Sequence, residues 1–260
     1  MNASTTVFMI RGPVAFFTIN RPEAGNAMTW AMYDALVEAC ERVDQAPDVR
    51  VFVIRAAGAT FCPGTDISQF TAFSTRQDGV EYEQRLEACV SRLERVAVTT
   101  IAQVEGIAAG GGCAIALACD LRVCSPAARF GVPIARTLGN GLSFENCARL
   151  VENFGMARAR TMLLTGAFID AGGAAASGAI TRLAEPGDVE RVVEELAAAI
   201  SRNAPLTMRA AKEALARLAA QRRKDDAAVA GLVADCYASE DFREGVSAFL
   251  SKRPPKFTGR

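Results

Sequence analysis

The sequence contains no histidine, and this absence removes several kinds of chemistry at once. Histidine is the usual general base near neutral pH, and its imidazole completes Ser-His-Asp and Cys-His nucleophilic sites. It is also the commonest metal ligand. We therefore expect none of these catalytic arrangements and no metal centre.

Paired cysteines are missing as well. The chain has eight cysteines, but no two form a C-x-x-C pair, and most lie within apolar runs. Disulfide frameworks and zinc sites need regularly spaced pairs, so these residues are typical of small core side chains in a reducing compartment.

The chain also lacks net charge and long hydrophobic segments. Its 29 basic residues balance 29 acidic ones, which argues against nucleic acid or a membrane surface as a partner. No apolar run reaches membrane-spanning length, and the first twenty residues lack the hydrophobic segment of a signal peptide. We expect a soluble cytoplasmic protein, with 260 residues forming one sizeable domain and a helical appendage.

The most informative stretch runs from Thr99 to Asp120. Its β-branched start predicts a strand that continues to Val104, and the small apolar run Ala114–Ala118 predicts a buried helix. Between them stand Gly106, Gly110, Gly111 and Gly112. Glycine is costly to order, so three in succession indicate a close approach of a ligand to the backbone, or else tight helix–strand packing. Free N–H groups at the helix start would suit an anion or a developing oxyanion.

Two familiar glycine loops do not fit this stretch. The dinucleotide fingerprint G-x-G-x-x-G fails because Ala108 stands two residues after Gly106 and Asp120 comes too early. The phosphate loop G-x-x-x-x-G-K-[ST] fails because Gly112 and Cys113 occupy the positions of the lysine and the hydroxyl residue.

Strands and helices alternate through about residue 185, and everything after it is helical. Strands are expected at 5–10, 14–19, 49–56, 99–104, 121–124 and 179–183, and residues 129–141 are expected to be irregular. Helices are expected at 29–43, 79–96, 114–118, 143–154, 156–164, 171–176, 188–201, 205–220, 224–238 and 240–250. This order predicts βαβ units and a mostly parallel sheet, which can place the loop Gly58–Asp66 beside the glycine-rich loop.

Three stretches stand out as sequence motifs: N-R-P-E-A-G-N-A-M at 20–28, F-C-P-G-T-D-I at 61–67, and G-I-A-A-G-G-G-C at 106–113. With F-G-V-P at 130–133, L-T-G at 164–166 and the segment 242–255, the sequence resembles the crotonase (enoyl-CoA hydratase/isomerase) superfamily over nearly its whole length. The resemblance implies an α/β fold, with a spiral of ββα units at 1–187 that binds acyl-CoA. It further implies a C-terminal helical region at 188–260 that assembles a homotrimer or a hexamer.

The resemblance also implies a coenzyme A thioester as the ligand, with no separate cofactor. The backbone N–H groups of Thr65 and Gly111 would form the oxyanion hole, in agreement with the free N–H groups inferred from the residues. The wall around the adenosine and the pantetheine would come from Ala24, Cys62, Gly64, Asp66 and Ile67, and Gly110 would also bind the substrate. Ser68 stands where some relatives carry a phosphate-binding lysine, which leaves Lys252 or Lys256 for that role. Asp66 has an alternative role as the N-cap of a helix. For Asp120 we favour a structural role over a functional one, as an acid at a helix end that accepts from buried N–H groups.

The sequence departs from the family at two positions that matter for catalysis. Hydratases of the family use two glutamates to hold and split a water, and Ala114 and Ile134 occupy those positions here. Hydration by the usual mechanism is therefore not expected. The nearest candidate base in the following loop is Glu145, which has an alternative role as a first-turn acid of a helix that Ser143 caps.

The resulting hypothesis is an acyl-CoA enzyme that stabilises a thioester enolate, with double-bond isomerisation as its reaction. Hydratase-like lyase action is the alternative within the same chemistry. A catalytically silent acyl-CoA-binding protein belongs to another class, and thioester hydrolysis is a third option. Whether Glu145 points at the thioester position separates the first hypothesis from the silent binder.

Overall fold

The computed structural model describes residues 4–223 and 227–260. Its main sheet has six strands in the order β1 (Thr6–Arg11), β2 (Val14–Ile19), β3 (Val51–Ala56), β4 (Thr99–Val104), β6 (Leu121–Cys124) and β9 (Arg182–Leu183). Strands β1 and β2 form the expected antiparallel hairpin, and all the other neighbours pair in parallel. A smaller sheet joins β5 (Ile107–Ala109), β7 (Arg129–Gly131) and β8 (Ile169–Asp170). The prediction of a mostly parallel sheet is confirmed.

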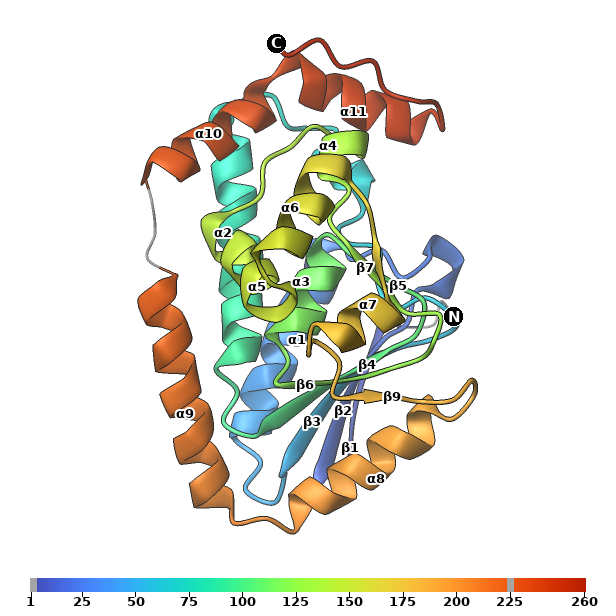
Figure 1. The fold of residues 1–260 in the computed structure, drawn as a ribbon, viewed down its shortest axis with the longest axis vertical. Helices are drawn as coiled ribbons and strands as arrows, with labels where there is room; N and C mark the ends of the chain where they lie inside the picture. Colours follow the sequence, from blue (N-terminus) through green and yellow to red (C-terminus); the bar gives the residue numbers. More distant parts are fainter. Residues whose placement is uncertain (1–3, 224–226) are drawn as a thin grey trace.

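Helices cover both faces of the main sheet, because its central strands are apolar on both sides. In β3, Phe52 and Ile54 pack into the larger hydrophobic cluster with α1 (Trp30–Asp44), α2 (Arg76–Glu94) and α3 (Gly111–Ala118). The alternate residues Val51 and Val53 pack against α8 (Val189–Ser201) on the other face, as the two-residue period of a strand requires. Figure 1 shows α8 lying against the sheet. The C-terminal region therefore begins with a helix that completes the core.

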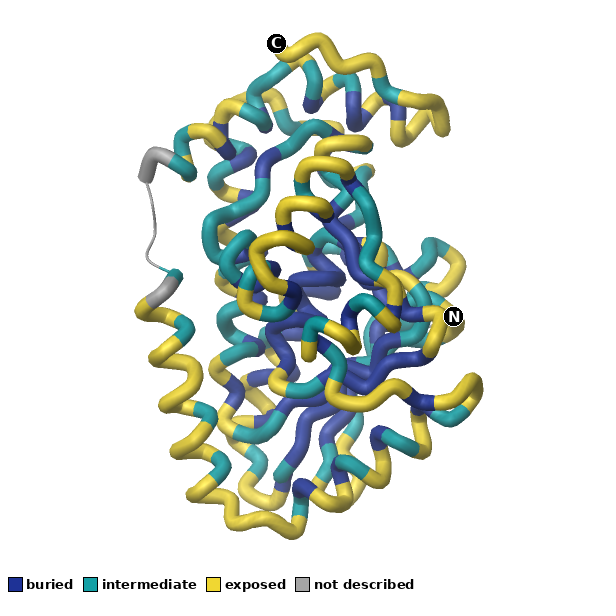
Figure 2. The backbone as a smooth tube through the Cα atoms, in the orientation of Figure 1, coloured by how far each residue is buried: buried dark blue, intermediate teal, exposed yellow. Residues whose placement is uncertain are grey.

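Helix α3 lies at the centre of the molecule, and all its residues are buried (Figure 2). The buried guanidinium of Arg122 donates to the carbonyl oxygens of Cys119 at 2.7 Å and Ala116 at 3.3 Å. A cation at this end complements the partial negative charge of the helix C-terminus. The opposite end, with its free N–H groups, faces the loops described below.

The other elements surround this core. They are η1 (Pro22–Ala24), η2 (Ile67–Phe70), α4 (Ile134–Thr137), α5 (Phe144–Phe154), α6 (Met156–Thr165), α7 (Ala171–Ala176), α9 (Pro205–Arg222), α10 (Ala227–Ala238) and α11 (Glu240–Leu250). The expectation of an irregular 129–141 segment was wrong, because β7 pairs with β5 and β8 and four residues form α4. Of the helix expected at 224–238, residues 224–226 lie outside the described residues. Among the residues that the structure does describe, no helix has both the length and the apolarity to span a membrane.

The C-terminal helices return to the core at one end of the molecule. Helix α10 packs against α2, and α11 packs against η2 and α4 (Figure 1). The aromatic side chains of Tyr237 on α10 and Phe242 on α11 meet with ring centroids 5.0 Å apart, and both are buried. Residues more than 130 positions after the end of α2 therefore lie beside it.

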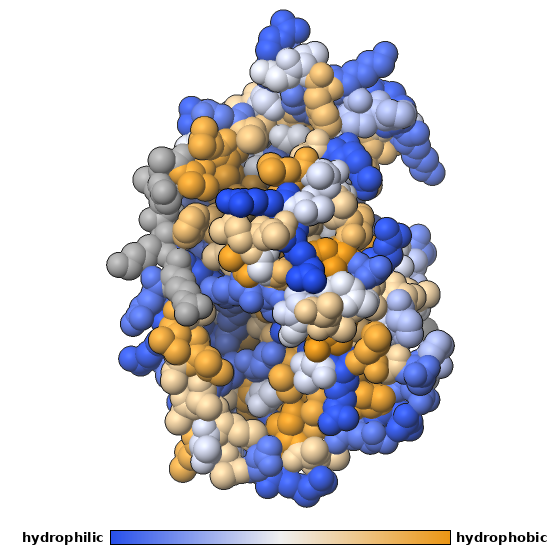
Figure 3. Space-filling model, in the orientation of Figure 1, coloured by the Kyte–Doolittle hydropathy of each residue, from blue (hydrophilic) through white to orange (hydrophobic). Residues whose placement is uncertain are grey.

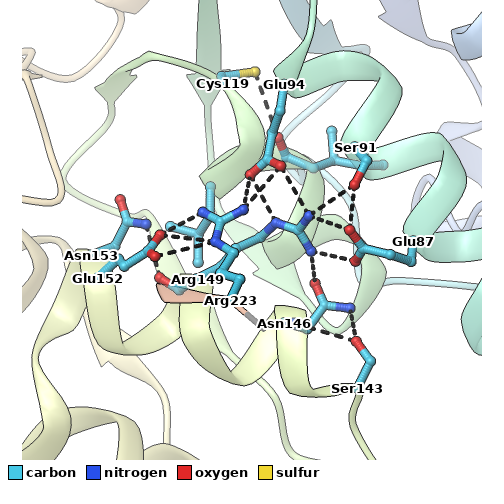
Figure 4. A network of polar contacts seen from close by, with 12 residues as sticks. Glu87, Ser91, Glu94, Cys119, Ser143, Asn146, Arg149, Glu152, Asn153 and Arg223 are labelled. Carbon is cyan, nitrogen blue, oxygen red and sulfur yellow. Dashed lines mark hydrogen bonds and ion pairs between the residues drawn. The ribbon is translucent and has the colours of Figure 1, made fainter. Parts of the chain in front are cut away.

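A buried ionic network ties α5 and the end of α9 to α2 (Figure 4). Arg149 is only 1% exposed and donates to Glu87 at 2.6 Å and to Glu94 at 2.9 Å. Arg223 bridges the same Glu94, at 2.7 Å, to Glu152. Burial removes water from these charged groups, so each depends on its ion-pair partner for compensation. Loss of one partner would leave a buried charge unpaired and destabilise the fold.

Helix α9 exposes apolar side chains, and we expect it to bury them between subunits. Leu206 is 79% exposed, Leu215 67% and Leu218 54%, and Figure 3 shows hydrophobic side chains gathered along this edge. A patch of this kind is typical of an interface. We predict a trimer or hexamer in light scattering at micromolar concentration. A mass near 27.5 kDa would contradict the prediction, and a double Leu215→Glu, Leu218→Glu variant should shift the mass downward.

Candidate active site

The two small-residue loops lie directly against each other. The backbone N–H of Cys62 donates to Ile107 at 2.9 Å, and the carbonyl of Cys62 accepts from Ala109 at 2.9 Å. A Cβ on Gly64 would lie 3.3 Å from the amide nitrogen of Gly111. The first motif joins the same place, because Met28 donates to the Gly64 carbonyl at 2.8 Å. The three motifs that carried the resemblance therefore converge on one site.

The successive glycines have separate structural reasons. Gly110 has φ +50°, which a side chain would strain, and a Cβ on Gly112 would overlap the Cys62 carbonyl. A Cβ on Gly111 would overlap the hydroxyl of Tyr33. Tight packing, one of the two readings left open, thus accounts for Gly111 and Gly112, and Gly110 and Gly111 also line an open cavity.

Two residues that line this cavity have backbone N–H groups without an acceptor among the described residues. Thr65 and Gly111 both line it, and within the described residues neither amide N–H donates to a protein oxygen. The side chain of Thr65 is fixed, because its Oγ1 lies 2.9 Å from the hydroxyls of both Tyr33 and Tyr82. Burial raises the pKa of both phenols, so they remain neutral and hold the loop by hydrogen bonding. Unpaired backbone N–H groups at a helix N-terminus are of the kind that can bind an anion or a developing oxyanion.

The cavity has a volume of about 440 Å³ and a mainly apolar wall. Of the residues predicted to contact the substrate, those that line it are Ala24, Gly64, Thr65, Asp66, Ile67, Gly110 and Gly111. Cys62 does not line it, because its side chain is fully buried and its backbone holds β5 in place. Lys252 is exposed and follows Leu250, which lines the cavity. Ala114 and Ile134, which replace the two hydratase glutamates, also line it.

Asp66 is the helix cap that one reading predicted. Its Oδ1 accepts from the Ser68 N–H at 3.0 Å, and its Oδ2 accepts from Arg21 at 2.6 Å. Burial opposes ionisation, but the hydrogen bonds from Arg21 and Ser68 prevail and lower the pKa of Asp66. Asp66 is therefore held as a carboxylate and is poorly suited to carry protons near neutral pH.

Glu145 lies outside the cavity. It stands in the first turn of α5 and lines two other hollows, whereas the next residue, Asn146, faces the cavity. The physical reason is the helix period, since consecutive side chains differ by about 100° in direction. Ser143 caps the helix through a 3.3 Å bond from the Asn146 N–H, as the alternative reading of Glu145 required. We therefore do not assign the proton transfer to Glu145.

Glu83 is the carboxyl group that faces the cavity and that the sequence interpretation missed. Its side chain accepts from the Tyr237 hydroxyl at 2.6 Å and from the Ser143 N–H at 3.1 Å. It is 8% exposed, and burial raises its pKa from 4.5 to about 7. A signal was present in the sequence, because Glu83 interrupts the apolar stripe of α2 four residues after Gly79 and three before Leu86.

A hydrogen-bonded chain from the C-terminal region holds Glu83. The amide of Asn140 donates to the Tyr237 hydroxyl at 3.0 Å, so that hydroxyl is free to donate its own proton to Glu83. The side-chain oxygen of Asn140, Oδ1, is buried without a hydrogen-bond partner among the described residues. Asn140 also lines the cavity. Helix α10 is therefore part of the site.

The raised pKa of Glu83 predicts a pH-dependent stability. The folded state holds this proton up to about pH 7 and the unfolded state only to about 4.5, so the free energy of unfolding falls as pH rises between them. Full ionisation removes roughly 3 kcal/mol. We expect the free energy of unfolding, measured with urea, to fall less between pH 5 and 8 in Glu83→Gln than in wild type. Equal slopes in both proteins would contradict the prediction, and exposed Glu81→Gln on the same helix is the control.

Comparison with known proteins identifies the family. The model of the enoyl-CoA hydratase/isomerase family matches residues 10–260. The chain belongs to this family. The short-chain-enoyl-CoA hydratase of Clostridium acetobutylicum is 30% identical, with 97% of each chain covered. The 2,3-dehydroadipyl-CoA hydratase of Escherichia coli is 33% identical, with 95% of this chain and 96% of its own covered.

A solved structure of methylmalonyl-CoA decarboxylase with 2-nitronate-propionyl-CoA superposes with a TM-score of 0.90 at 25% identity, over the full length of both chains. The crotonase-like α/β fold with C-terminal helices is confirmed. The protein is thus an enzyme of a family that acts on coenzyme A thioesters.

Proposed function

We propose that the enzyme isomerises a 3-enoyl-CoA to the 2-enoyl-CoA through a thioester dienolate, with Glu83 as the single proton carrier. The observation that carries this proposal is the acid content of the cavity. Among its described lining residues only Asp66 and Glu83 are carboxylic acids, and Asp66 is held ionised by Arg21. Glu83 alone has a pKa near neutrality, where a group can both accept and return a proton.

The thioester oxygen would accept from the N–H groups of Thr65 and Gly111, which stabilises the negative charge of the dienolate. Glu83 lies on α2 about one helical turn before Leu86, which contacts this oxyanion site. Leu86 lies 3.6 Å from the Cβ position of Gly111, and Glu83 precedes Leu86 by three residues, a rise of about 4.5 Å. In the proposed reaction the carboxyl would reach the first carbons of the acyl chain, where the proton moves from C2 to C4.

A single carboxyl is sufficient for isomerisation and insufficient for the usual hydration. In isomerisation the same group removes a proton and then returns it two carbons away. Hydration also needs a water held on the β-carbon, and Ala114 and Ile134 offer it no hydrogen bond. The mainly apolar cavity wall favours a dienolate whose charge lies only at the oxyanion site.

Decarboxylation of a 2-carboxyacyl-CoA is a second candidate, favoured by the TM-score of 0.90 to methylmalonyl-CoA decarboxylase. The C2–carboxylate bond would break with release of CO₂, its electron pair would form a thioester enolate at the same oxyanion site, and protonated Glu83 would deliver a proton to C2. An apolar wall would disfavour the substrate carboxylate and so promote its loss. The two reactions require opposite forms of Glu83, and therefore pH separates them.

The test is a panel of a 3-enoyl-CoA, crotonyl-CoA and methylmalonyl-CoA, followed by absorbance and mass spectrometry. We expect turnover of the 3-enoyl-CoA. Thr65→Pro removes one oxyanion donor and should lower kcat by about a hundred- to a thousandfold while binding weakens less. Thr65→Ser keeps the N–H and the hydroxyl and is the matched control. Turnover of methylmalonyl-CoA alone would replace isomerisation by decarboxylation, and no turnover would leave a silent acyl-CoA-binding protein.

A further inference from the structure

Glu83 faces a second hollow besides the substrate cavity. This rear hollow has a volume of about 410 Å³ and is bounded by α2, the start of α5 and α10. Its lining includes Gln84, Glu87, Ala88, Ser91, Glu145 and Ala230. Of the described residues, Glu83 alone lines both spaces. Glu83 therefore borders both of them.

The two spaces differ in chemistry. The substrate cavity is mainly apolar, whereas the rear hollow carries the side chains of Glu87, Ser91, Arg95 and Glu145. Figure 4 shows Glu87 and Ser91 next to each other on α2, where Glu87 also accepts from Arg149 at 2.6 Å. A space of this size with several polar partners can hold a cluster of water molecules, since one water occupies about 30 Å³.

The rear hollow also opens to solvent. Gln84, Ala88 and Arg95 line it and are exposed on the surface of α2 and the turn after it. Each oxygen of Glu83 uses one acceptor position, for Tyr237 or for Ser143, and a carboxylate has roughly four such positions. Glu83 can therefore contact substrate on one side and water on the other at the same time.

We propose that the rear hollow is a proton-exchange route, through which the proton on Glu83 equilibrates with bulk water while substrate fills the cavity. The inference rests on the proposed role of Glu83. The C2–H bond breaks, its electron pair enters the dienolate, and Glu83 gains the proton. Glu83 then passes that proton to a water in the rear hollow and takes another from it. Finally the new proton forms the C4–H bond, so no charge or electron is gained or lost.

The experiment follows a 3-enoyl-CoA in D₂O and measures by mass spectrometry and NMR how much product carries solvent deuterium at C4. We expect wild type to incorporate deuterium in most turnovers. Gln84→Trp combined with Ala88→Trp fills the hollow. It should raise severalfold the share of internal return, that is, of turnovers in which the proton removed from C2 is itself delivered to C4. Gln77→Trp is the matched control, because Gln77 is an exposed glutamine two turns earlier on the same helix and does not line the hollow. A variant that is merely less stable would lose rate without changing this partition.

A second variant, Ala230→Trp, fills the hollow from α10 and serves if the double variant does not fold. Complete internal return in wild type, or the same partition in filled and control variants, would overturn the inference while the isomerase activity stands. The exchange of α-hydrogens of butyryl-CoA with D₂O uses the oxyanion site and Glu83 without any isomerisation. If a 3-enoyl-CoA is not turned over but this exchange occurs and slows severalfold in the filled variants, the exchange route stands and the isomerase proposal fails. If neither reaction occurs, both proposals fail together.

Discussion

Glu83→Gln is expected to lower isomerisation of a 3-enoyl-CoA by about a hundred- to ten-thousandfold, the range that a single general acid–base group contributes. The amide keeps the size of the side chain, can still accept from the Ser143 N–H, and cannot carry the proton. The dissociation constant for a non-reacting acyl-CoA, measured by calorimetry, should change little. A joint loss of kcat and binding would indicate a structural role instead.

Two further variants make this result specific. Glu81→Gln changes an exposed carboxyl on the same helix and should retain the wild-type rate. Glu83→Asp keeps the acid but retracts it by one methylene, so it should recover part of the activity that Glu83→Gln loses. If Glu145→Gln rather than Glu83→Gln abolished turnover, the assignment of the base would be wrong.

The pH profile supports the same assignment and separates the two candidate reactions. Burial raises the pKa of Glu83 to about 7, so the carboxylate that removes a C2 proton forms only as pH rises through this value. The kcat/KM of isomerisation should therefore rise with pH and level off above about 8. Decarboxylation needs the protonated form to deliver its proton, so its rate should fall over the same interval. Bound substrate removes water from the site and would move either midpoint upward in kcat.

Local patterns in the sequence predicted much of the fold. The pattern of residues 49–56, the β-branched start of Thr99–Val104 and the apolar stripe of α2 each predicted an element, and the structure contains all three. The segment 129–141 resisted prediction because its three-residue strand and its single-turn helix are too short to show a period. The strand β7 forms because β5 and β8 pair with it, and the helix α4 packs against α6 and α11.

The candidate site was also predicted only in part from the sequence. The loops around Thr65 and Gly111 could be located because glycine runs and small residues mark places where backbone must come close. The proton carrier could not, because Glu83, Ser143 and Tyr237 lie far apart in the sequence and meet only through the packing of α10 on α2. The position of Glu145 one residue from the cavity-facing Asn146 shows how a small uncertainty in alignment along a helix changes which side chain reaches the substrate.

Wild-type enzyme is expected to hydrate crotonyl-CoA at least about a thousandfold more slowly than a site with two glutamates, because each acid–base group contributes roughly a hundred- to ten-thousandfold. Ala114 and Ile134 line the same cavity as the two free backbone N–H groups, so the space where the water would stand is present but apolar. The constructive test is Ala114→Glu with Ile134→Glu, which should raise the hydration rate measured by the loss of enoyl absorbance.

This gain depends on protonation and not merely on polarity. Ala114→Gln with Ile134→Gln has the same shape and hydrogen-bonding capacity but cannot transfer protons, so it should remain as slow as wild type. The acidic pair will reduce stability, since Ala114 is 8% exposed and a buried carboxyl costs several kcal/mol unless it is partnered. Thermal melts of both pairs show whether enough folded protein remains at the assay temperature. If both pairs fold and hydrate equally slowly, positions 114 and 134 do not hold a water over the thioester, and the resemblance in loop geometry ends before the catalytic carboxylates. If wild type itself hydrates crotonyl-CoA rapidly and Glu83→Gln does so equally well, the proton carriers lie elsewhere in the cavity and the isomerase proposal loses its basis.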